Sequence, residues 1–533
     1  MQKNRPVVLM ILDGWGLSPS WGGNALVMNN PKNIDNLWRN YPHKILQALG
    51  AIEYGNVVGE SRLGHLMIGA GRSVKSPHTR INQEIIGRTF YKNQQLAGAF
   101  AWAKQNNSNV HLIGMISNGG VHSDISHLLA LLEMAHRQDF DRVFIDAITD
   151  GTDTGPTQAL NFIEKIRVKM DDVKIGQFGS VCGRNTAMDR DENWDKIKKY
   201  YLALTEGNGK ISDKIESAIS ESYRNNLTDE YIEPTLIKDK DGKINPIKAG
   251  DAVIFFNFRE DRARQLAKVF LDSKFKTFFF RPKKVENLYF CGFTNYQKDL
   301  PAKVAFPDEI YANNLSEVVS KSNGKQLKIA ESEKMAHVTY FLNGGQEEAY
   351  PGEERKIISS PKVASYDLKP EMSSRQITSA TLSAIKSRKY DLIVLNFANV
   401  DMIAHTGNII AVGQAVQSLD EQVGQIVKAN RSVGGVTIIT ADHGNAEQMV
   451  NINQSDVGER ETMHTLNPVP FIMVKNDAKK DLIRTSLSYG PNALSKIISA
   501  TDSLADIAPT ILQLLEIPKP AQMTGHSLLN RLE

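Results

Sequence analysis

Short runs of apolar and β-branched residues alternate with helical patterns along almost the whole chain. Such alternation predicts an α/β protein with mainly parallel sheets. Three of the runs, Val7–Leu12, Leu392–Leu395 and Val436–Ile439, are short and apolar enough to form strands that are buried on both faces. Polar residues follow each of these runs closely, so the ends of the predicted strands are the first places to look for chemistry.

The polar residues after these strands are carboxylates and histidines. They are Asp13 after the first run, Asp401 and His405 after the second, and Asp442 and His443 after the third. The i,i+4 spacing of Asp401 and His405 suits one face of a helical turn. Because open α/β sheets bind ligands at the carboxyl ends of their strands, we expect these side chains to share one site.

Carboxylate and imidazole ligands together suit Mn²⁺ or Zn²⁺ better than Mg²⁺ or Ca²⁺. His464, which precedes the apolar run Phe471–Val474, would add a further imidazole, although its spacing alone is weak support. Taken singly, any Asp or His of this kind is more often a helix cap or a surface polar group. The combined set favours a two-metal centre.

A second group of predicted strands is followed mainly by arginines instead of by carboxylates and histidines. The runs are Val110–Ile116, Arg142–Ile148, Val173–Val181 and Ala252–Phe258. The loops after them carry His122, Asp153, Arg184, Arg190, Arg259 and Arg262. Clustered arginines suit bidentate recognition of phosphate and carboxylate. We therefore expect a discontinuous metal domain, residues 1–76 and 309–533, interrupted by an inserted substrate domain, residues 77–308.

The glycine-rich segment Val58–Arg72 contains one hydroxyl group that stands out, that of Ser61. A divalent metal can activate a serine hydroxyl by stabilising its alkoxide. Alternatively, Ser61 caps a helix that begins near Leu63, and both roles are compatible because a helix amino terminus favours a bound phosphoryl group. The glycines match neither a P-loop nor a dinucleotide-binding fingerprint.

Length, net charge and cysteine content limit the number of domains, the kinds of partner and the cellular location that are expected. The chain has 533 residues, which is too long for one core and indicates two or more domains. Its net charge of +3 provides no global field that would favour nucleic acid or a membrane, and no apolar run is long enough to span a bilayer. Cys182 and Cys291 lie far apart in apolar runs, so two buried thiols and a cytoplasmic location are expected.

Several longer segments, in order along nearly the whole chain, carry a family resemblance. They are Val58–Arg72, Gly119–Ser123, Ala187–Asp191, Phe258–Arg264, Ala330–Lys334, His337–Tyr340, Ser360–Ala364, Ala441–Glu447 and Asn467–Pro470. Together they resemble the cofactor-independent phosphoglycerate mutases of the alkaline phosphatase superfamily. The resemblance implies an alkaline-phosphatase-like metal domain interrupted by an inserted phosphotransferase domain, and a monomer.

The resemblance also implies roles for individual residues. One metal would be held by Asp401, His405 and His464, and the other by Asp13, Ser61, Asp442 and His443. The metals would be two Mn²⁺ ions, with Zn²⁺ or Co²⁺ as alternatives, and no 2,3-bisphosphoglycerate would be needed. Ser61 would take the phosphoryl group of 3-phosphoglycerate as a phosphoserine, and Lys334 would neutralise its charge. The glycerate would be held by His122, Asp153, Arg184, Arg190, Arg259 and Arg262.

The chain departs from the family pattern at four places near the expected substrate. Glu60 and Arg62 flank the nucleophile in place of Asn and Glu, Thr152 replaces an arginine, Asp124 replaces a histidine, and Asn185-Thr186 replaces an aromatic pair. These changes fit either a divergent mutase, in which Arg62 compensates for Thr152, or a paralogue acting as phosphotransferase or phosphohydrolase on another ester. Sulfatase chemistry and a non-catalytic binding role are disfavoured, the first by the setting of both cysteines and the second by the intact nucleophile and ligand set.

Overall fold

The computed structural model describes residues 6–18, 23–48, 59–277, 280, 282–451, 459–476 and 501–531. The chain divides into two compact units. The first unit comprises Met1–Glu53, Val57–Val74 and Glu309–Glu533, and the second comprises Tyr54–Asn56 and Lys75–Asp308, as far as these ranges are described. No helix among the described residues is long and apolar enough to cross a membrane.

The first unit is built on a seven-stranded sheet. In sheet order its strands are β12 (Glu353–Ile358), β11 (Gln326–Glu331), β13 (Leu392–Phe397), β1 (Val7–Leu12), β14 (Val436–Thr440), β15 (Val469–Val474) and β2 (His43–Leu46). The first five run parallel, whereas β15 and β2 are antiparallel to their neighbours. Every residue of β1, β13 and β14 is buried, which agrees with the continuous apolar runs of these central strands.

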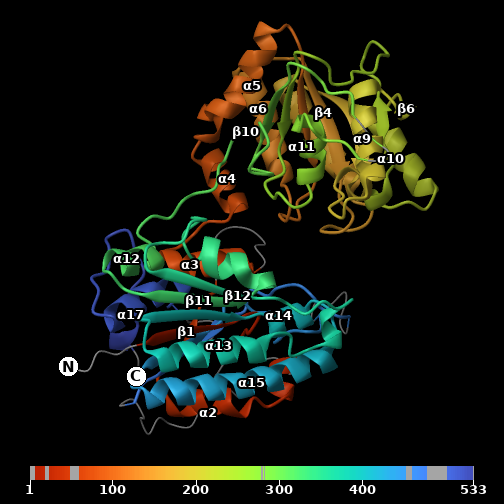
Figure 1. Ribbon diagram of the computed structural model, residues 1–533. Helices are drawn as coiled ribbons and strands as arrows, with labels where there is room; N and C mark the ends of the chain where they lie inside the picture. The colour runs from red at the N-terminus through yellow and green to blue at the C-terminus, as the bar shows by residue number, and fades with distance from the viewer. Residues whose placement is uncertain are drawn as a thin grey trace. The chain divides into compact units, whose positions relative to one another are not determined.

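Helices cover both faces of this sheet (Figure 1). One layer contains α2 (Lys32–Asn40), α13 (Ser374–Ser387) and α15 (Ile409–Ser432). The opposite layer contains α3 (Ser61–Ala70), α12 (Leu315–Lys321) and α17 (Ile507–Leu514). The short helices α1 (Ala25–Met28) and α14 (Asn399–Ala404) complete the unit, and α14 begins two residues after β13 ends. Helices therefore cover both faces of the sheet, and a ligand site is expected at the ends of its strands.

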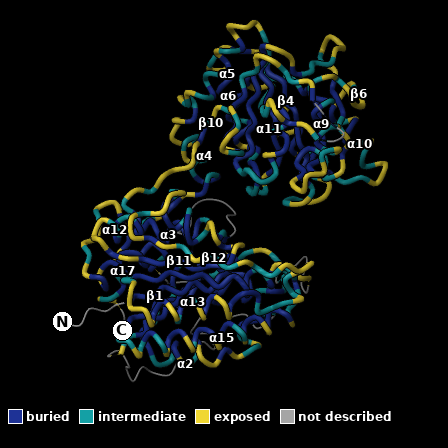
Figure 2. Tube along the Cα trace, in the orientation of Figure 1, coloured by how far each residue is buried: buried dark blue, intermediate teal, exposed yellow. Residues whose placement is uncertain are grey.

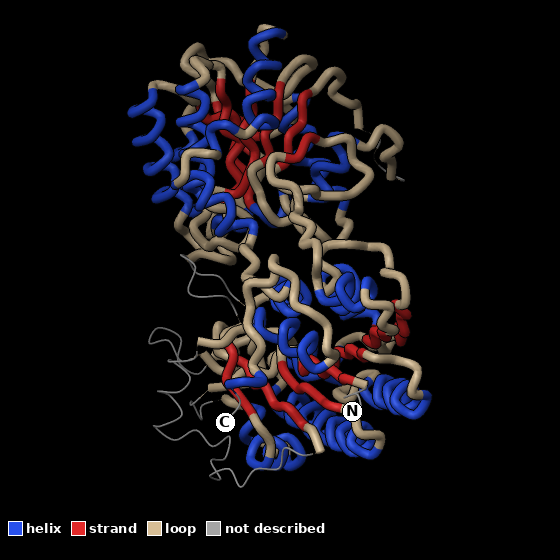
Figure 3. The backbone as a smooth tube through the Cα atoms, turned by 90° about the vertical axis from the view of Figure 1, so that its left-hand side faces the viewer, coloured by secondary structure: helices blue, strands red, loops and turns tan. Residues whose placement is uncertain are grey.

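The second unit contains an eight-stranded sheet. In sheet order its strands are β10 (Lys303–Val304), β9 (Tyr289–Gly292), β8 (Ala252–Phe255), β3 (Val110–Met115), β4 (Val143–Thr149), β5 (Gln177–Gly183), β7 (Thr235–Ile237) and β6 (Lys210–Ser212). Only the β5–β7 pair is antiparallel. Figure 3 shows the strands of this unit enclosed by helices, as expected for a mainly parallel sheet.

Each face of the second sheet has its own hydrophobic core. One core is closed by α4 (Pro77–Ile86), α5 (Gln94–Gln105), α6 (Ile125–Arg137), α7 (Ala159–Val173) and α10 (Ile215–Arg224). The other is closed by α8 (Arg184–Ala187), α9 (Trp194–Glu206) and α11 (Arg264–Leu271). Figure 2 shows the buried residues concentrated in the interior of each unit.

Two predicted strand boundaries were wrong, since the strand expected over Ala252–Phe258 ends at Phe255 and the one expected from Val173 begins later. Val173 is the last residue of α7 rather than the first of a strand, and β5 begins at Gln177. Val173 is buried because it lies on the apolar face of that helix, and Lys174 then ends the helix with a φ of 59°. A short apolar run cannot by itself distinguish the last turn of a helix from the beginning of a strand.

Candidate metal centre and substrate-binding loops

The register of the first sheet brings the predicted metal ligands to one edge. Leu12 lies beside Phe397, and Ile11 lies beside Thr440. The residues that follow these strands therefore emerge next to one another. Asp401 is held in the first turn of α14, and Asp13 and Asp442 lie in the loops after β1 and β14. All three carboxylates are almost completely buried.

Two histidines converge on Asp401. The Nε2 atoms of His405 and His464 lie 2.9 Å apart, at 3.5 and 3.3 Å from Asp401 Oδ1. The Nδ1 atom of each ring lies 2.8 Å from a backbone carbonyl oxygen, that of Thr462 for His405 and that of Gly59 for His464. If both Nδ1 atoms carry the proton, two Nε2 lone pairs face each other across a short distance. A cation bound between the two Nε2 atoms would remove the repulsion between these lone pairs.

A second cluster surrounds the Ser61 hydroxyl. Ser61 Oγ lies 2.7 Å from His443 Nε2 and 3.5 Å from Asp13 Oδ1. His443 Nε2 lies 3.4 Å from Asp442 Oδ2 and 3.6 Å from Asp13 Oδ1. Asp442 Oδ1 is buried and receives no hydrogen bond from any described residue. A buried carboxylate oxygen without a donor is costly, so this position also fits a cation.

Lys334 lies between the two clusters. It follows β11 in the short helix η3 (Ser332–Lys334), and its Nζ donates to Asp13 Oδ1 at 2.7 Å, Asp401 Oδ2 at 2.8 Å and Ser61 Oγ at 3.0 Å. Burial favours the neutral amine, but Asp13 and Asp401 raise the pKa of Lys334 above its usual value. Burial and then repulsion from Asp442 raise the pKa of Asp13 to about 7. One lysine therefore does not balance three buried carboxylates, which again favours bound cations.

Two residues of this centre were missed by the sequence analysis. His65 lies one helical turn after Ser61, and its Nδ1 lies 2.8 Å from the Ser61 carbonyl oxygen. Asn396 Nδ2 lies 2.7 Å from Asp13 Oδ2 and 3.1 Å from His65 Nε2, so one amide group links a predicted ligand to the helix of the nucleophile. The i,i+4 spacing of Ser61 and His65 was a signal available in the sequence.

The loops of the second unit bring Arg184 and Asp153 together. Arg184 Nη1 donates to Asp150 Oδ1 and to Asp153 Oδ2, both at 2.6 Å. Asp150 also accepts a hydrogen bond from Ser117 Oγ at 2.6 Å, so it joins the loops that follow β3, β4 and β5. Asp150 was not among the predicted site residues, because its role depends on three loops that are separate in sequence.

Asp261 organises the remaining cationic groups. Its Oδ1 lies 3.5 Å from His122 Nδ1 and 3.2 Å from Arg259 Nε, and its Oδ2 lies 3.7 Å from Arg190 Nη1. Arg262 Nη1 donates to the Met188 carbonyl oxygen at 3.2 Å, in the segment just before Arg190. Burial lowers the pKa of His122 to about 3 despite Asp261. His122 is thus a neutral hydrogen-bonding group among arginines.

The positions that depart from the family pattern have defined surroundings. Thr152 is exposed, and its backbone N–H donates to Asp150 Oδ1 at 3.2 Å. Arg62 Nε lies 2.9 Å from Glu60 Oε1, so the two unusual neighbours of Ser61 form an ion pair. Asn185 and Thr186 lie within the short helix α8.

Asp124 belongs to a buried polar cluster. Its Oδ1 caps α6 by accepting from Ser126 N at 2.8 Å, and its Oδ2 lies 2.8 Å from His78 Nε2. The amide group of Asn82 lies 3.1 Å from His78 Nε2 and 2.9 Å from His127 Nε2. Asp124 thereby ties α4 to the beginning of α6, next to the loop that carries His122.

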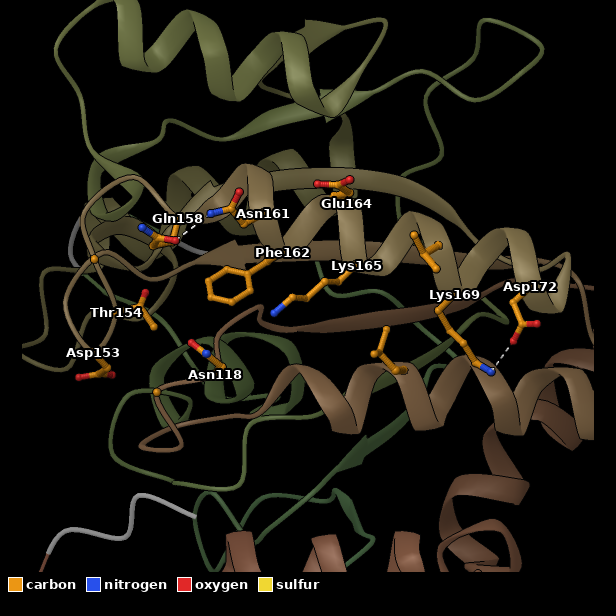
Figure 4. A pocket seen from close by; sticks show the side chains of 14 residues that line it. Asn118, Asp153, Thr154, Gln158, Asn161, Phe162, Glu164, Lys165, Lys169 and Asp172 are labelled. Atoms are coloured by element: carbon orange, nitrogen blue, oxygen red, sulfur yellow. Dashed lines mark hydrogen bonds and ion pairs between the residues drawn. The ribbon is translucent and has the colours of Figure 1, made fainter. Parts of the chain in front are cut away.

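A groove of about 1190 Å³ lies in the second unit between α6 and α7 (Figure 4). It is lined near the β3 and β4 loops by Asn118, Asp153 and Gln158, and farther along α7 by Lys165 and Lys169. Among the predicted substrate residues it includes Asp153 alone, and it contains none of the arginines. This groove therefore shares Asp153 with the predicted substrate residues and lies apart from the arginines.

Comparison with known proteins identifies the family of the chain. Residues 81–298 match the family model described as BPG-independent PGAM N-terminus. The chain is 43% identical over 532 residues to a 2,3-bisphosphoglycerate-independent phosphoglycerate mutase of Clostridium botulinum, which covers 99% of this chain and 100% of the relative. The chain belongs to this family. A phosphoglycerate mutase of Methanosarcina barkeri is 44% identical over 533 residues, with 99% of both chains covered.

A solved structure supports the same family at the level of the fold. The phosphoglycerate mutase of Leishmania mexicana, described at low cobalt concentration, superposes with a TM-score of 0.72 at 27% identity, covering 98% of this chain and 97% of that one. The family resemblance of the sequence motifs is thus confirmed over the full length of the chain. Phosphoglycerate mutases of this kind are named for working without 2,3-bisphosphoglycerate.

Proposed function

We propose that the protein interconverts 3-phosphoglycerate and 2-phosphoglycerate by way of a phosphoserine on Ser61. The observation that carries the proposal is the position of the Ser61 hydroxyl. Oγ lies at the amino terminus of α3, 2.7 Å from His443 Nε2 and 3.0 Å from Lys334 Nζ. A helix amino terminus and a fixed cation both favour a phosphoryl group at this atom.

Two divalent metals fit the donor set. Asp401, His405 and His464 would hold one, and Asp13, Ser61, Asp442 and His443 would hold the other. Mixed carboxylate and imidazole donors favour Mn²⁺, with Zn²⁺ or Co²⁺ as alternatives. When bound, the metals would supply Lewis acidity that stabilises the Ser61 alkoxide and the charge of the transferring group.

The chain's own residues account for the rest of the reaction. In the first step the bond between Ser61 Oγ and phosphorus forms as the bond between phosphorus and the substrate's 3-oxygen breaks. In the second step the 2-oxygen takes the phosphoryl group from Ser61, so no second phosphate donor is consumed. Lys334 provides fixed positive charge beside Oγ in both steps.

The second unit would hold the glycerate between these steps. Its arginines suit the substrate carboxylate, and the buried His122 offers a hydrogen bond without adding charge. We assign substrate binding to His122, Asp153, Arg184, Arg190, Arg259 and Arg262, with the metal unit and the substrate unit acting as phosphatase-like and phosphotransferase domains. We also propose that the protein is cytoplasmic and monomeric. Light scattering should then give the mass of one chain, 59.3 kDa.

A second candidate is a phosphotransferase or phosphohydrolase that acts on another phosphate ester. It is favoured by Thr152, which offers no guanidinium where the family pattern has one, and by Arg62, which is already paired with Glu60. Introducing Thr152→Arg discriminates between the two. For a mutase we expect the KM for 3-phosphoglycerate to fall about 10- to 100-fold, because a charged hydrogen bond contributes about 1.5–3 kcal/mol. Thr154→Arg adds the same charge two residues away as the control, and an unchanged KM in Thr152→Arg favours the other ester.

Phosphorus NMR of the metal-stripped protein with 3-phosphoglycerate, before and after adding Mn²⁺ and without 2,3-bisphosphoglycerate, tests the proposal directly. The expected result is a 2-phosphoglycerate signal that requires Mn²⁺ and is lost in Ser61→Ala. Release of inorganic phosphate instead would identify a hydrolase. An unchanged spectrum from protein that binds Mn²⁺ would mean that the pocket accepts a different ester.

A further inference from the structure

Glu447 lies in the loop after β14 and was not among the predicted site residues. Its side chain is completely buried. Oε2 accepts from the backbone N–H groups of Gly16 at 3.1 Å and Asn445 at 2.7 Å. Oε1 accepts from Asn467 Nδ2 at 2.9 Å and from the Thr465 hydroxyl. One carboxylate therefore joins the loop after β1, the loop after β14 and the segment before β15.

The chemistry of these partners favours a carboxylate. All four partners are donors, and a carboxylate offers only acceptor sites. Burial raises the pKa of Glu447, whereas the bonds from Thr465 and Asn467 act in the opposite direction. An amide at this position would present an NH₂ group to Thr465 and Asn467, so Gln could keep these bonds only if the Thr465 hydroxyl accepted and the Asn467 amide turned over.

The backbone at Gly16 and Gly444 lies so close to the Glu447 carboxylate that neither position has room for a side chain. A Cβ atom at Gly16 would lie 2.3 Å from Glu447 Cδ, and one at Gly444 would lie 2.3 Å from Glu447 Oε1. Such distances are far below normal van der Waals contact. Both loops therefore approach Glu447 as closely as they do only because these positions lack a side chain.

Each of the loops that Glu447 joins leads to a proposed metal ligand. Asn445, whose backbone binds Glu447, donates from its side-chain amide to Asp401 Oδ1 at 2.9 Å. Thr465, whose hydroxyl binds Glu447, directly follows His464. These two connections reach the Asp401–His405–His464 cluster.

We propose that Glu447 is a positioning residue that pre-organises the Asp401–His405–His464 site for its metal. The inference rests on the proposed function, because it requires these three residues to bind a metal. Residues that orient metal ligands through hydrogen bonds typically change metal affinity about 10- to 100-fold when they are lost. Glu447 bonds to Thr465, which directly follows His464, and to the backbone of Asn445, whose side chain bonds to Asp401, so the effect of its loss is expected to fall in this range.

The experiment measures Mn²⁺ binding, by the decrease of the electron paramagnetic resonance signal of free Mn²⁺, for the full chain and for Glu447→Gln. In the variant we expect at least one of the two dissociation constants to rise about 10- to 100-fold. Equal binding by both proteins would overturn the inference. Absence of Mn²⁺ binding by the unaltered chain would instead overturn the proposed function, so the two failures are distinguishable.

Glu353→Gln is the matched control, because Glu353 is a buried carboxylate of the same unit that bonds to Asn343 and Arg355. Both of its Mn²⁺ dissociation constants should remain within about threefold of the original values. An equal loss of Mn²⁺ affinity in this control would mean that removing any buried charge weakens metal binding, and would overturn the inference.

Gly16→Ala is a second test that keeps the carboxylate and displaces it. The added methyl group would lie within 2.5 Å of both oxygens of Glu447. The same dissociation constant should rise as in Glu447→Gln. This variant decides the question if Glu447→Gln does not fold, and unchanged Mn²⁺ binding by Gly16→Ala would then overturn the inference.

Discussion

Lys334 is a cation that the proposed nucleophile shares with two of the proposed metal ligands. Its ammonium group contacts Ser61 Oγ, Asp13 and Asp401 at 2.7–3.0 Å in a buried setting. Charge fixed in such a position stabilises developing negative charge without having to reorganise. Its removal should therefore affect the rate of transfer more than the binding of substrate.

Replacing Lys334 by Met should lower kcat about 100-fold or more and leave KM nearly unchanged. Steady-state kinetics with 3-phosphoglycerate, at Mn²⁺ concentrations shown to saturate the variant, would measure this. Lys328→Met provides the control, since Lys328 is a buried lysine of the same unit that bonds to Ser316 and Asn343 rather than to the centre. A large rise in KM with an unchanged kcat would contradict the role given to Lys334.

Residues at strand ends could be predicted from the sequence, and residues that act through loop contacts could not. Asp13, Asp401 and Asp442 follow apolar strands within four residues, and parallel strands deliver such residues to one edge of the sheet. Asp261 and Glu447 are ordinary acidic residues in the sequence. Their roles depend on partners that become neighbours only in the folded chain, such as Gly16, which is 431 residues from Glu447.

At the scale of secondary structure, α4 is tied to the beginning of α6 by the contact between His78 and Asp124. Asp124 caps α6 through Oδ1 and binds His78 through Oδ2. Burial raises the pKa of Asp124, but the bond to His78, the nearby His127 and the bonds from Ser126 together hold this pKa well below its usual value. The carboxylate therefore has two separable functions, which different substitutions can distinguish.

Asp124→Ala should destabilise the second unit by about 2–4 kcal/mol, because it removes a helix cap and leaves His78 without its charged partner. Asp124→Asn keeps an oxygen that can cap α6 and should cost about 1–2 kcal/mol less. Denaturant unfolding followed by fluorescence would measure both. Equal losses for the two variants would show that the cap contributes nothing.

Strand cores were easier to predict than element boundaries. The buried runs of β1, β3, β13 and β14 were apparent because continuous apolar residues suit strands covered on both faces. The start of β5 was not, since Val173 continues the apolar face of α7. The antiparallel pairs β14–β15 and β15–β2 also carried no sequence signal, because strand direction depends on how the connecting chain returns to the sheet.

At the scale of the whole molecule, two units with separate cores should respond separately to ligands. The proposed metal ligands all lie in the first unit. Mn²⁺ at about 100 times its dissociation constant should stabilise that unit by about 2.7 kcal/mol per site. Calorimetry is expected to show two transitions, of which only one moves when Mn²⁺ is added or chelated. A parallel shift of both would contradict independent unfolding of the units.

Lys328 should make the stability of the first unit depend on pH. Burial lowers the pKa of Lys328 to about 7, from 10.5 in an exposed lysine. Between these values the unfolded chain binds a proton that the folded chain does not, so the free energy of unfolding rises with pH through this window. The limiting slope is about 1.4 kcal/mol per pH unit. Denaturant unfolding between pH 7 and 10 would measure the rise, which Lys328→Met should abolish.

The order of strands in the first sheet has a consequence for biosynthesis. Val7 of β1 pairs with Leu392 of β13, 385 residues later, while every strand of the second unit is complete by residue 304. At translation rates of about 5–20 residues per second, β1 waits about 20–80 s for that partner. During this interval the second unit can fold beside the ribosome, but six apolar residues of β1 have no sheet to enter. The nascent chain therefore exposes a fully buried strand for this interval, which makes it a natural client for chaperones that hold extended apolar segments.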